Sequence, residues 1–291
     1  MIHAPVASIS VSTLLKLGRV SNLPTVWTNV LAGAALADAE LRTWRLSLVL
    51  LAMSLFYVGG MFLNDYFDRA IDAGERPERP IPARAISASA VASIGLALLG
   101  AGVFLTAIMG QVPGAIALLL GACIIAYDVH HKENALSPVL MGACRTLVYL
   151  ASAAALRGTI SVQVALPAAA MAAYVAGLTY AARQESLDGM GNLWPLVLLC
   201  APLATAAGAL QQGSGAVLIY VTMVGWTAGA VWLLSRRPST GSVGRAVGRL
   251  IAGISLVDAA ALASLEILPA ACAALAGFVA TLIAQKYVAA T

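Results

Sequence analysis

Apolar stretches separated by short polar segments follow one another along nearly the whole chain. A helix that spans a membrane needs about 20 mostly apolar residues, and no long linker or change of composition interrupts this pattern. The sequence therefore predicts an all-α, polytopic membrane helical bundle with nine to ten transmembrane helices in a single domain, residues 1–291. The expected spans are 20–38, 46–66, 88–109, 113–130, 136–156, 162–182, 193–211, 215–235, 246–266 and 268–287.

Two segments differ from a simple span. Residues 10–19 combine apolar and polar side chains in a way that is typical of a short amphipathic helix on the membrane surface. The ninth expected span, 246–266, is the weakest, because it carries Asp258 and Ser255 within its apolar stretch. A partly interfacial helix is the alternative for this segment, and the sequence identifies no partner for Asp258.

Composition supports the membrane assignment. The chain is 60% hydrophobic and 10% charged, whereas soluble domains are about 45–50% apolar. The net charge of +4 is modest, so membrane lipids are the expected surroundings and no nucleic-acid partner is expected. The four cysteines lie in apolar stretches without metal-ligand spacing, which favours small packing residues over a metal site or a disulfide framework.

The basic residues predict the orientation. If the N-terminus is cytoplasmic, most of the 17 Lys and Arg fall on the cytoplasmic side, as the positive-inside rule requires. Arg42, Arg45 and Arg157 fall on the other side, and Arg145 lies within a span. Most of the acids share the cytoplasmic side although acids do not set topology, which indicates a cavity lined by both charges and open to the cytoplasm.

The densest acidic cluster follows the second span. Asp65, Asp68 and Asp72 have offsets of 0, 3 and 7 residues, which places them on one face of a helix with about 3.6 residues per turn. Asn64 stands one turn below Asp68. Like charges so close together need a cation, and hard oxygen ligands suit Mg²⁺, which commonly shares its coordination shell with substrate phosphates. We predict that these aspartates bind metal and, with Asn64, take part in catalysis.

The next loop, 73–84, is basic. Pro80 and Pro82 end the helix and stiffen the chain, so Arg76, Arg79 and Arg84 are expected near the carboxylate face. Arginine offers planar donors that match phosphate oxygens, and we interpret Arg79 and Arg84 as substrate-binding. Ordinary positive-inside charge is the alternative.

A second cluster ends the fourth span. Lys132 is expected to bind phosphate, and Tyr127 and Asp128 to line the cavity. The adjacent His130 and His131 face different ways on a helix and make a poor metal pair. An arginine within a membrane should face the protein interior and an anion; for Arg145 the candidates are a diphosphate, a motif acid or a purely structural partner.

A third cluster, Arg183, Glu185 and Asp188, ends the sixth span on the same side. Glu185 and Asp188 are neighbours on a helix face and are predicted to be metal ligands opposite the first cluster, with Arg183 binding substrate. Two four-helix halves would then face one cavity. A solvated helix end is the alternative. Arg19 and Asn22, which open the first span, are further substrate-binding candidates.

These motifs resemble those of the UbiA superfamily of intramembrane prenyltransferases. Asn64-Asp65-x-x-Asp68-x-x-x-Asp72 is similar to its first aspartate motif, and Arg79-Pro80-Ile81-Pro82 to the loop that follows it. The Tyr127…Lys132 and Arg19…Asn22 elements fit more weakly. The resemblance implies a helical bundle around a central cavity that opens to the bilayer, with Mg²⁺, a polyprenyl diphosphate donor and a small, often aromatic acceptor.

The second motif departs from the family pattern. Arg183-Gln-Glu185-Ser-Leu-Asp188 stands where relatives have a larger aspartate set, and it resembles a UbiA-like branch that includes EboC-type proteins of bacterial gene clusters. A bacterial inner membrane is therefore the expected location. Three hypotheses follow: prenyl transfer, a membrane terpene cyclase without a separate acceptor, and a lipid or small-molecule transporter.

Overall fold

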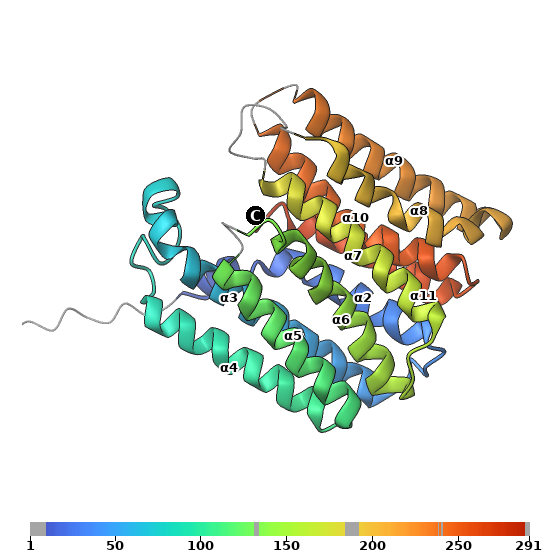
Figure 1. Ribbon diagram of the computed structural model, residues 1–291, viewed down its shortest axis with the longest axis horizontal. Helices are drawn as coiled ribbons and strands as arrows, with labels where there is room; N and C mark the ends of the chain where they lie inside the picture. Colours follow the sequence, from blue (N-terminus) through green and yellow to red (C-terminus); the bar gives the residue numbers. More distant parts are fainter. Residues whose placement is uncertain (1–9, 131–133, 184–191, 238, 240, 289–291) are drawn as a thin grey trace, which may run out of the picture.

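The computed structural model describes residues 10–130, 134–183, 192–237, 239 and 241–288, and it is built from helices (Figure 1). Within these residues no strand is present. The helical elements are α1 (Val11–Leu17), the 3-10 helix η1 (Val20–Asn22), α2 (Leu23–Leu36), α3 (Trp44–Glu75), α4 (Ala88–Ala107), α5 (Gln111–His130), α6 (Ser137–Arg157), α7 (Val162–Arg183), η2 (Trp194–Cys200), α8 (Ala201–Thr205), η3 (Ala207–Gln211), α9 (Ser214–Arg236), α10 (Ser242–Ala263) and α11 (Leu268–Ala284).

Each expected span corresponds to helical structure. In the described chain, 7 helices are long and apolar enough to cross a membrane, and shorter apolar helices cover Trp194–Thr205 and Leu268–Ala284. The expected surface helix is also present, as α1. The prediction of an all-helical membrane bundle is therefore confirmed.

Helix α3 continues well beyond its expected end at residue 66. It has 32 residues and is therefore about 48 Å long, whereas the hydrocarbon core of a bilayer is about 30 Å thick. Its N-terminus is capped by Thr43, whose side chain accepts a hydrogen bond from the Arg45 amide. The extra length carries the acidic cluster past the apolar part of the helix.

The seventh expected span, 193–211, is not one continuous α-helix. It consists of η2, α8 and η3 in succession. Pro195 and Pro202 lie in the first turns of η2 and α8, where a proline ring and its missing N–H are tolerated; neither can continue a preceding helix. The apolar pattern predicted the span but not these breaks.

Helix α10 corrects the expectation of a weak, partly interfacial ninth span. In its most apolar stretch 83% of the residues are buried. Asp258 is 0% exposed and accepts hydrogen bonds from Asn29 of α2 and Tyr149 of α6. The acid that weakened the sequence prediction is thus satisfied by residues of two other helices in the core.

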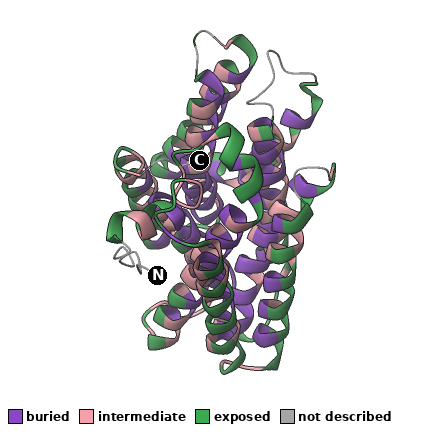
Figure 2. Cartoon of the chain, turned by 90° about the vertical axis from the view of Figure 1, so that its left-hand side faces the viewer, coloured by how far each residue is buried: buried purple, intermediate pink, exposed green. Residues whose placement is uncertain are grey.

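The two largest hydrophobic cores of the described chain share two helices, and a smaller one lies around Leu17 and Phe62. One core joins α2, α3, α4, α5 and α6, and the other joins α2, α6, α7, α9, α10 and α11. Figure 1 shows α2 and α6 between these two groups. Buried residues line the interior of the bundle while exposed ones cover its outside (Figure 2).

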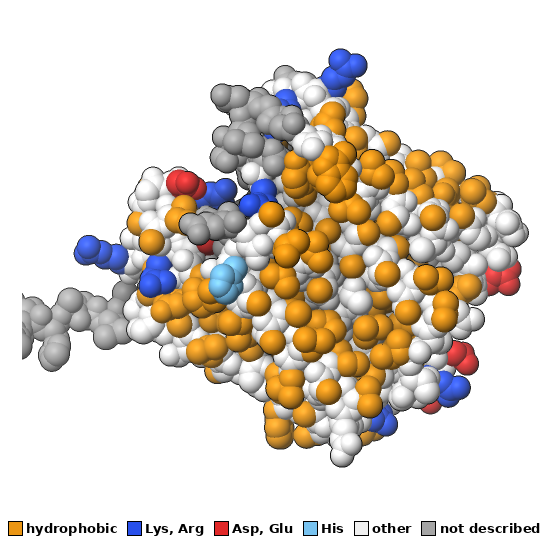
Figure 3. Space-filling view, viewed as in Figure 1, with side chains coloured by type: hydrophobic (Ala, Val, Ile, Leu, Met, Phe, Trp, Pro, Cys, Tyr) orange, Lys and Arg blue, Asp and Glu red, His pale blue; other side chains and the backbone are white. Residues whose placement is uncertain are grey.

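The outer surface matches a membrane environment. Hydrophobic side chains cover most of the face in Figure 3, and the charged side chains lie mainly at its edges. Large exposed apolar residues such as Phe104, Leu118 and Trp232 belong to the outer helices α4, α5 and α9. Apolar surface of this extent is typical of proteins surrounded by lipid.

Candidate active site

The C-terminal turns of α3 bury one polar face. Asp65, Asp68 and Asp72 are 5%, 7% and 4% exposed, and Asn64 is buried beside them. Arg69, which lies between the second and third aspartates in sequence, is exposed. The predicted common face of these acids is therefore confirmed, and it is directed into the protein.

Two arginines offset part of the charge of this face. The guanidinium of Arg79 donates to Asp72 Oδ2 at 2.9 Å and to Asp65 Oδ1 at 3.3 Å. Arg19 donates to the same Asp65 oxygen at 3.3 Å and to Asn64 Oδ1 at 3.4 Å. The loop arginine and the entry arginine, which are far apart in the sequence, thus meet at the carboxylates.

The backbone around Arg19 is arranged to reach this point. Arg19 has φ 41°, in the left-handed region, between α1 and η1. Such a conformation costs of order 1–2 kcal/mol for a residue with a side chain, so the surrounding structure has to hold it. Leu17, 0% exposed, packs with Phe62 of α3 and Val91 of α4 and anchors the segment.

A cavity begins beside the carboxylates and extends between α2, α3, α5 and α6. It contains about 570 Å³ of space free of protein atoms, its open mouth included. Asn64 Nδ2 donates to Asp128 Oδ1 at 3.3 Å, and this hydrogen bond connects the acidic face to the cavity wall. The lining residues are Val26, Met53, Phe56, Tyr57, Gly60, Met61, Leu120, Ile124, Tyr127, Asp128, Met141, Cys144, Arg145 and Val148.

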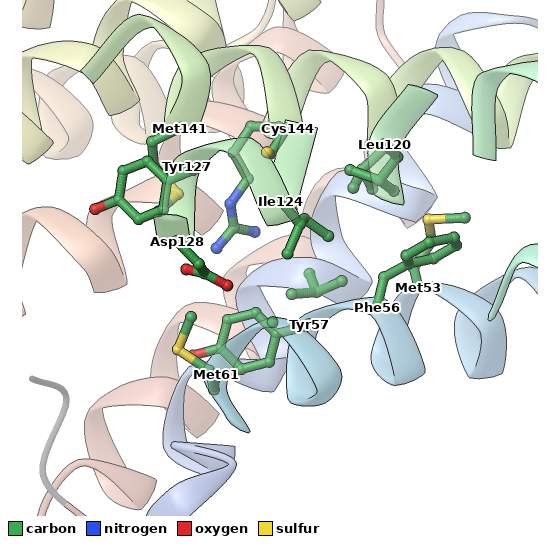
Figure 4. Close-up of a pocket in the computed structure, with 14 residues that line it drawn as sticks. Met53, Phe56, Tyr57, Met61, Leu120, Ile124, Tyr127, Asp128, Met141 and Cys144 are labelled. Carbon is green, nitrogen blue, oxygen red and sulfur yellow. The ribbon is translucent and has the colours of Figure 1, made fainter. Parts of the chain in front are cut away.

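The cavity is polar at one end and apolar at the other. Figure 4 shows Asp128, Tyr127 and Met61 at one end and Met53, Phe56 and Leu120 at the opposite end. Met53 precedes Asn64 by about three helical turns, or roughly 16 Å along the axis of α3. A long apolar chain whose charged head lies at the carboxylates fits this shape.

The carboxylate face has donors suited to Mg²⁺ but does not form a complete ligand set. Among the described residues, no three His, Cys, Asp or Glu side chains are grouped closely enough to hold a metal ion. Arg79 lies between Asp65 and Asp72 instead. Because Mg²⁺ keeps several water or phosphate ligands, Asp65, Asp68 and Asp72 fit a metal that a diphosphate helps to coordinate.

Several predicted residues lie apart from this cluster. Arg84, at φ 57°, is exposed in the loop. Asn22 is buried, accepts from Gln285 Nε2 at 3.2 Å and is hydrogen-bonded to Tyr57 of the cavity wall, so it does not reach the carboxylates. Arg183 donates to Asn134 O and Ser137 Oγ, at 3.0 and 3.2 Å, and so connects the end of α7 to the start of α6. Lys132, Glu185 and Asp188 lie outside the described residues, so their roles remain predictions.

Arg145 has a partner that the sequence did not identify. It donates to Asn29 Oδ1 at 2.8 Å and to Thr25 Oγ1 at 3.3 Å. The amide of Asn29 donates in turn to both oxygens of Asp258, at 3.0 and 2.8 Å. The motif acids expected as possible partners are therefore not its partners; a structural network reaches it from α2 and α10.

Sequence reasoning missed most of the cavity wall. Met53, Met61, Met141 and Leu120 look like ordinary membrane-helix residues, and no spacing separates them from lipid-facing positions. Tyr149, a partner of Asp258, likewise lies in an apolar stretch. Of the residues in the Asp258 network, Asn29 and Asp258 stood out in the sequence as polar residues within apolar stretches. Nothing in the sequence indicated that these two side chains contact each other.

The comparisons with known proteins agree with this geometry. Residues 25–250 match the profile of the UbiA prenyltransferase family. The chain is 38% identical over 121 residues to the digeranylgeranylglyceryl phosphate synthase of Methanothrix thermoacetophila, a match covering 41% of this chain and 45% of that protein. It is 31% identical over 168 residues to the same enzyme of Natronomonas pharaonis, covering 56% and 59%. The chain spans about half the length of the curated relatives it matches.

Solved structures share the fold. A UbiA homologue from Aeropyrum pernix superposes with a TM-score of 0.62 at 19% identity, covering 84% of this chain and 98% of that one. A UbiA homologue from Archaeoglobus fulgidus, bound to DMAPP and Mg²⁺, gives a TM-score of 0.56 at 14% identity, covering 84% and 98%. At these identities the likeness concerns the fold.

Proposed function

Because the chain belongs to the UbiA prenyltransferase family, we propose that it transfers a prenyl group from a polyprenyl diphosphate to a small acceptor within the membrane, with Mg²⁺ as cofactor. One observation supports this most strongly. The buried face of Asn64, Asp65, Asp68 and Asp72, where two arginines pair with Asp65 and Asp72, lies beside a long apolar cavity. A charged head and an apolar tail are thereby accommodated together.

The charged end of the donor, its diphosphate, is proposed to bind at the acidic face. Asp65, Asp68 and Asp72 would hold Mg²⁺, which supplies Lewis-acid stabilisation of the leaving diphosphate when bound. Arg19 and Arg79 are proposed to replace some of their hydrogen bonds to aspartate with hydrogen bonds to phosphate oxygens, since a guanidinium group can bind either anion with two parallel N–H donors. The C1–O bond breaks with its electron pair going to diphosphate. The acceptor oxygen forms the new bond to C1, and its proton goes to the released diphosphate.

The residues at and after the ends of α5 and α7 are proposed to form the second half of the diphosphate and metal site. Lys132, Glu185 and Asp188 are proposed to approach the diphosphate and metal from the ends of α5 and α7. Helices α5 and α7 both end on the side where α3 carries its acids, as their alternation along the chain requires. Arg183, at the end of α7, is proposed to add positive charge there.

The prenyl chain is proposed to lie along the apolar part of the cavity, between Met61 and Leu120. Methionine side chains adapt to irregular apolar ligands, and Tyr57 and Phe56 present aromatic rings in the same wall. Aromatic faces stabilise nearby cations, so Tyr57 is proposed to favour a developing allylic cation near the polar end, whereas Phe56 lies at the apolar end and contacts the tail. Water is excluded from most of this volume because its walls are apolar.

The relatives offer a concrete first acceptor. They are named for making digeranylgeranylglyceryl phosphate, so an acceptor with one prenyl group fewer is geranylgeranylglyceryl phosphate. We propose a hydroxyl-bearing acceptor of this general kind, with the cavity mouth on the cytoplasmic side according to the positive-inside distribution. These relatives come from organisms such as Methanothrix and Natronomonas, and they give no support for a bacterial source.

The test uses the purified protein in nanodiscs with geranylgeranyl diphosphate, Mg²⁺ and geranylgeranylglyceryl phosphate. Diphosphate release and the prenylated product, followed by mass spectrometry, should both require Mg²⁺. Asp68→Asn and Asp72→Asn should each lower the rate about 10²–10³-fold, a typical loss for one electrostatic group at the reacting centre. Glu75→Gln is the matched control, because Glu75 lies one turn further along α3 and is exposed.

Three results would change the conclusion. If the wild type released no diphosphate from geranylgeranyl, farnesyl or geranyl diphosphate, the prenyltransferase proposal would be wrong. If it released a hydrocarbon or terpene alcohol from the donor alone, the chain would be a cyclase. Wild-type rates in both aspartate variants would exclude α3 as the metal-binding helix.

A further inference from the structure

Arg145 brings a positive charge into the wall of the cavity. It lies eight residues into α6, about 12 Å along the helix from Ser137, and it lines the same cavity as Asp128 and Tyr57. An ionisable side chain at such a depth is costly and is retained in most cases for function. The proposed transfer described above does not use this residue.

The direct partners of Arg145 are neutral. Its guanidinium donates to the amide oxygen of Asn29 and the hydroxyl of Thr25. Arg19 and Arg79, in contrast, form ion pairs with the carboxylates of the acidic face. A guanidinium has five N–H donors, and these two hydrogen bonds leave the remaining ones available on a partly exposed side chain.

A counter-charge holds Arg145 without covering it. Asp258, 0% exposed, lies behind Asn29 and accepts from its amide with both oxygens. Tyr149 donates to the same carboxylate. Asn29 therefore presents its oxygen to Arg145 and its amide to Asp258, and this fixes the orientation of the arginine while leaving its charge directed toward the cavity.

We propose that Arg145, oriented by Asn29 and Asp258, binds an oxyanion of the acceptor, a phosphate or a carboxylate. That the bound anion belongs to an acceptor rests on the proposed prenyl transfer, whereas the binding of an anion by Arg145 does not depend on it. The donor's diphosphate has its own arginines, Arg19 and Arg79, at the acidic face. Arg145 lies on α6 in the cavity wall and bonds to Asn29 and Thr25 instead of to those carboxylates, so it gives the cavity a second anion-binding position. Planar guanidinium groups favour bidentate oxyanions.

The test measures binding, not turnover. Two pairs of probes differ only in the oxyanion: geranylgeranylglyceryl phosphate against geranylgeranylglycerol, and 4-hydroxybenzoate against 4-hydroxybenzyl alcohol. Dissociation constants are measured by thermophoresis in nanodiscs of zwitterionic phosphatidylcholine, so that lipid charge does not attract the probes. The wild type should bind the anionic member of at least one pair about tenfold more tightly or better, and Arg145→Gln should abolish this preference. The pair that discriminates tells phosphate from carboxylate.

Three comparisons separate this role from a structural one. Arg145→Lys keeps the positive charge but loses the parallel N–H donors of the planar guanidinium, so it should retain part of the preference for the anionic probe. This variant replaces Arg145→Gln in the test if the Gln variant does not fold. Arg157→Gln, at the exposed end of the same helix, should bind like the wild type. Binding of geranylgeranyl thiodiphosphate, a stable donor analogue, should be the same in Arg145→Gln and in wild type.

The proposal would be overturned by any of three results. These results are equal binding of both members of each pair by the wild type, a preference that survives in folded Arg145→Gln, and weaker binding of the donor analogue by that variant to the same extent as of the anionic probe. The last result would move Arg145 to the donor site. Because these are binding measurements, a failure of prenyl transfer itself would show separately, as missing diphosphate release in the wild type.

Discussion

Gly142 is the position where a single added carbon should disturb the bundle most clearly. It lies on α6, where the helix meets α7, and a Cβ built there would be 2.4 Å from the carbonyl oxygen of Ala172. Ordinary contacts begin near 3.4 Å. Gly142→Ala must therefore move the two helix backbones apart by about 1 Å, because backbone atoms cannot rotate away as a side chain can.

The size of the effect follows from two opposing terms. Overpacking costs about 1–3 kcal/mol, and contact with backbone places this site near the upper end. Replacing Gly by Ala within a helix stabilises the protein by about 1 kcal/mol, because Ala has the higher helix propensity. We expect Gly142→Ala to lose about 2 kcal/mol of stability, whereas Gly100→Ala on α4, with no atom within 4 Å of its Cβ, should gain up to about 1 kcal/mol.

Thermal unfolding with a thiol-reactive dye measures this difference. Cys144 is buried next to the contact, while Cys200 and Cys272 are exposed and react before unfolding. Gly142→Ala should melt roughly 6 °C or more below Gly100→Ala, at about 2–4 °C for each kcal/mol. Equal melting temperatures would refute the close α6–α7 approach from which the prediction was derived.

Three further predictions test the site. Leu120→Trp fills the apolar end of the cavity, so the ratio of activity on geranylgeranyl to geranyl diphosphate should fall about tenfold or more; an unchanged ratio would place the prenyl chain elsewhere. Arg79→Gln leaves its two aspartate partners without their guanidinium, so the protein should lose about 1.5–3 kcal/mol of stability and melt at a lower temperature. The decrease in melting temperature should be smaller with Mg²⁺ and diphosphate than with EDTA; equal decreases in both would argue against metal binding there. Asp258→Leu removes the buried counter-charge of Arg145 and should cost about 3–5 kcal/mol, with Asp258→Asn milder, as measured by the same melting assay; a melt like that of the wild type would exclude the network.

The acidic face shows how far local spacing can be used. Asp65, Asp68 and Asp72 were predicted to share a face from their offsets alone, and all three are buried together. Helical periodicity is a local property, so the sequence contains it. The proline loop also led correctly to Arg79, because chain stiffness keeps a nearby residue near the helix it follows. Arg84, five residues later, is exposed, which proximity in sequence could not reveal.

The sequence alone determined that this is a helical membrane protein and which stretches are helical spans, because apolar length and backbone hydrogen bonding leave few alternatives inside a bilayer. It also determined the first acidic motif and the family. It did not determine the end of α3 or the breaks within 193–211. Only the tertiary structure decided which polar residues meet: Asn29 and Asp258 are far apart in the chain, and their pairing depends on how α2 and α10 pack. The same packing selected the cavity wall from many equivalent apolar residues, because in a membrane helix both lipid-facing and ligand-facing positions are apolar.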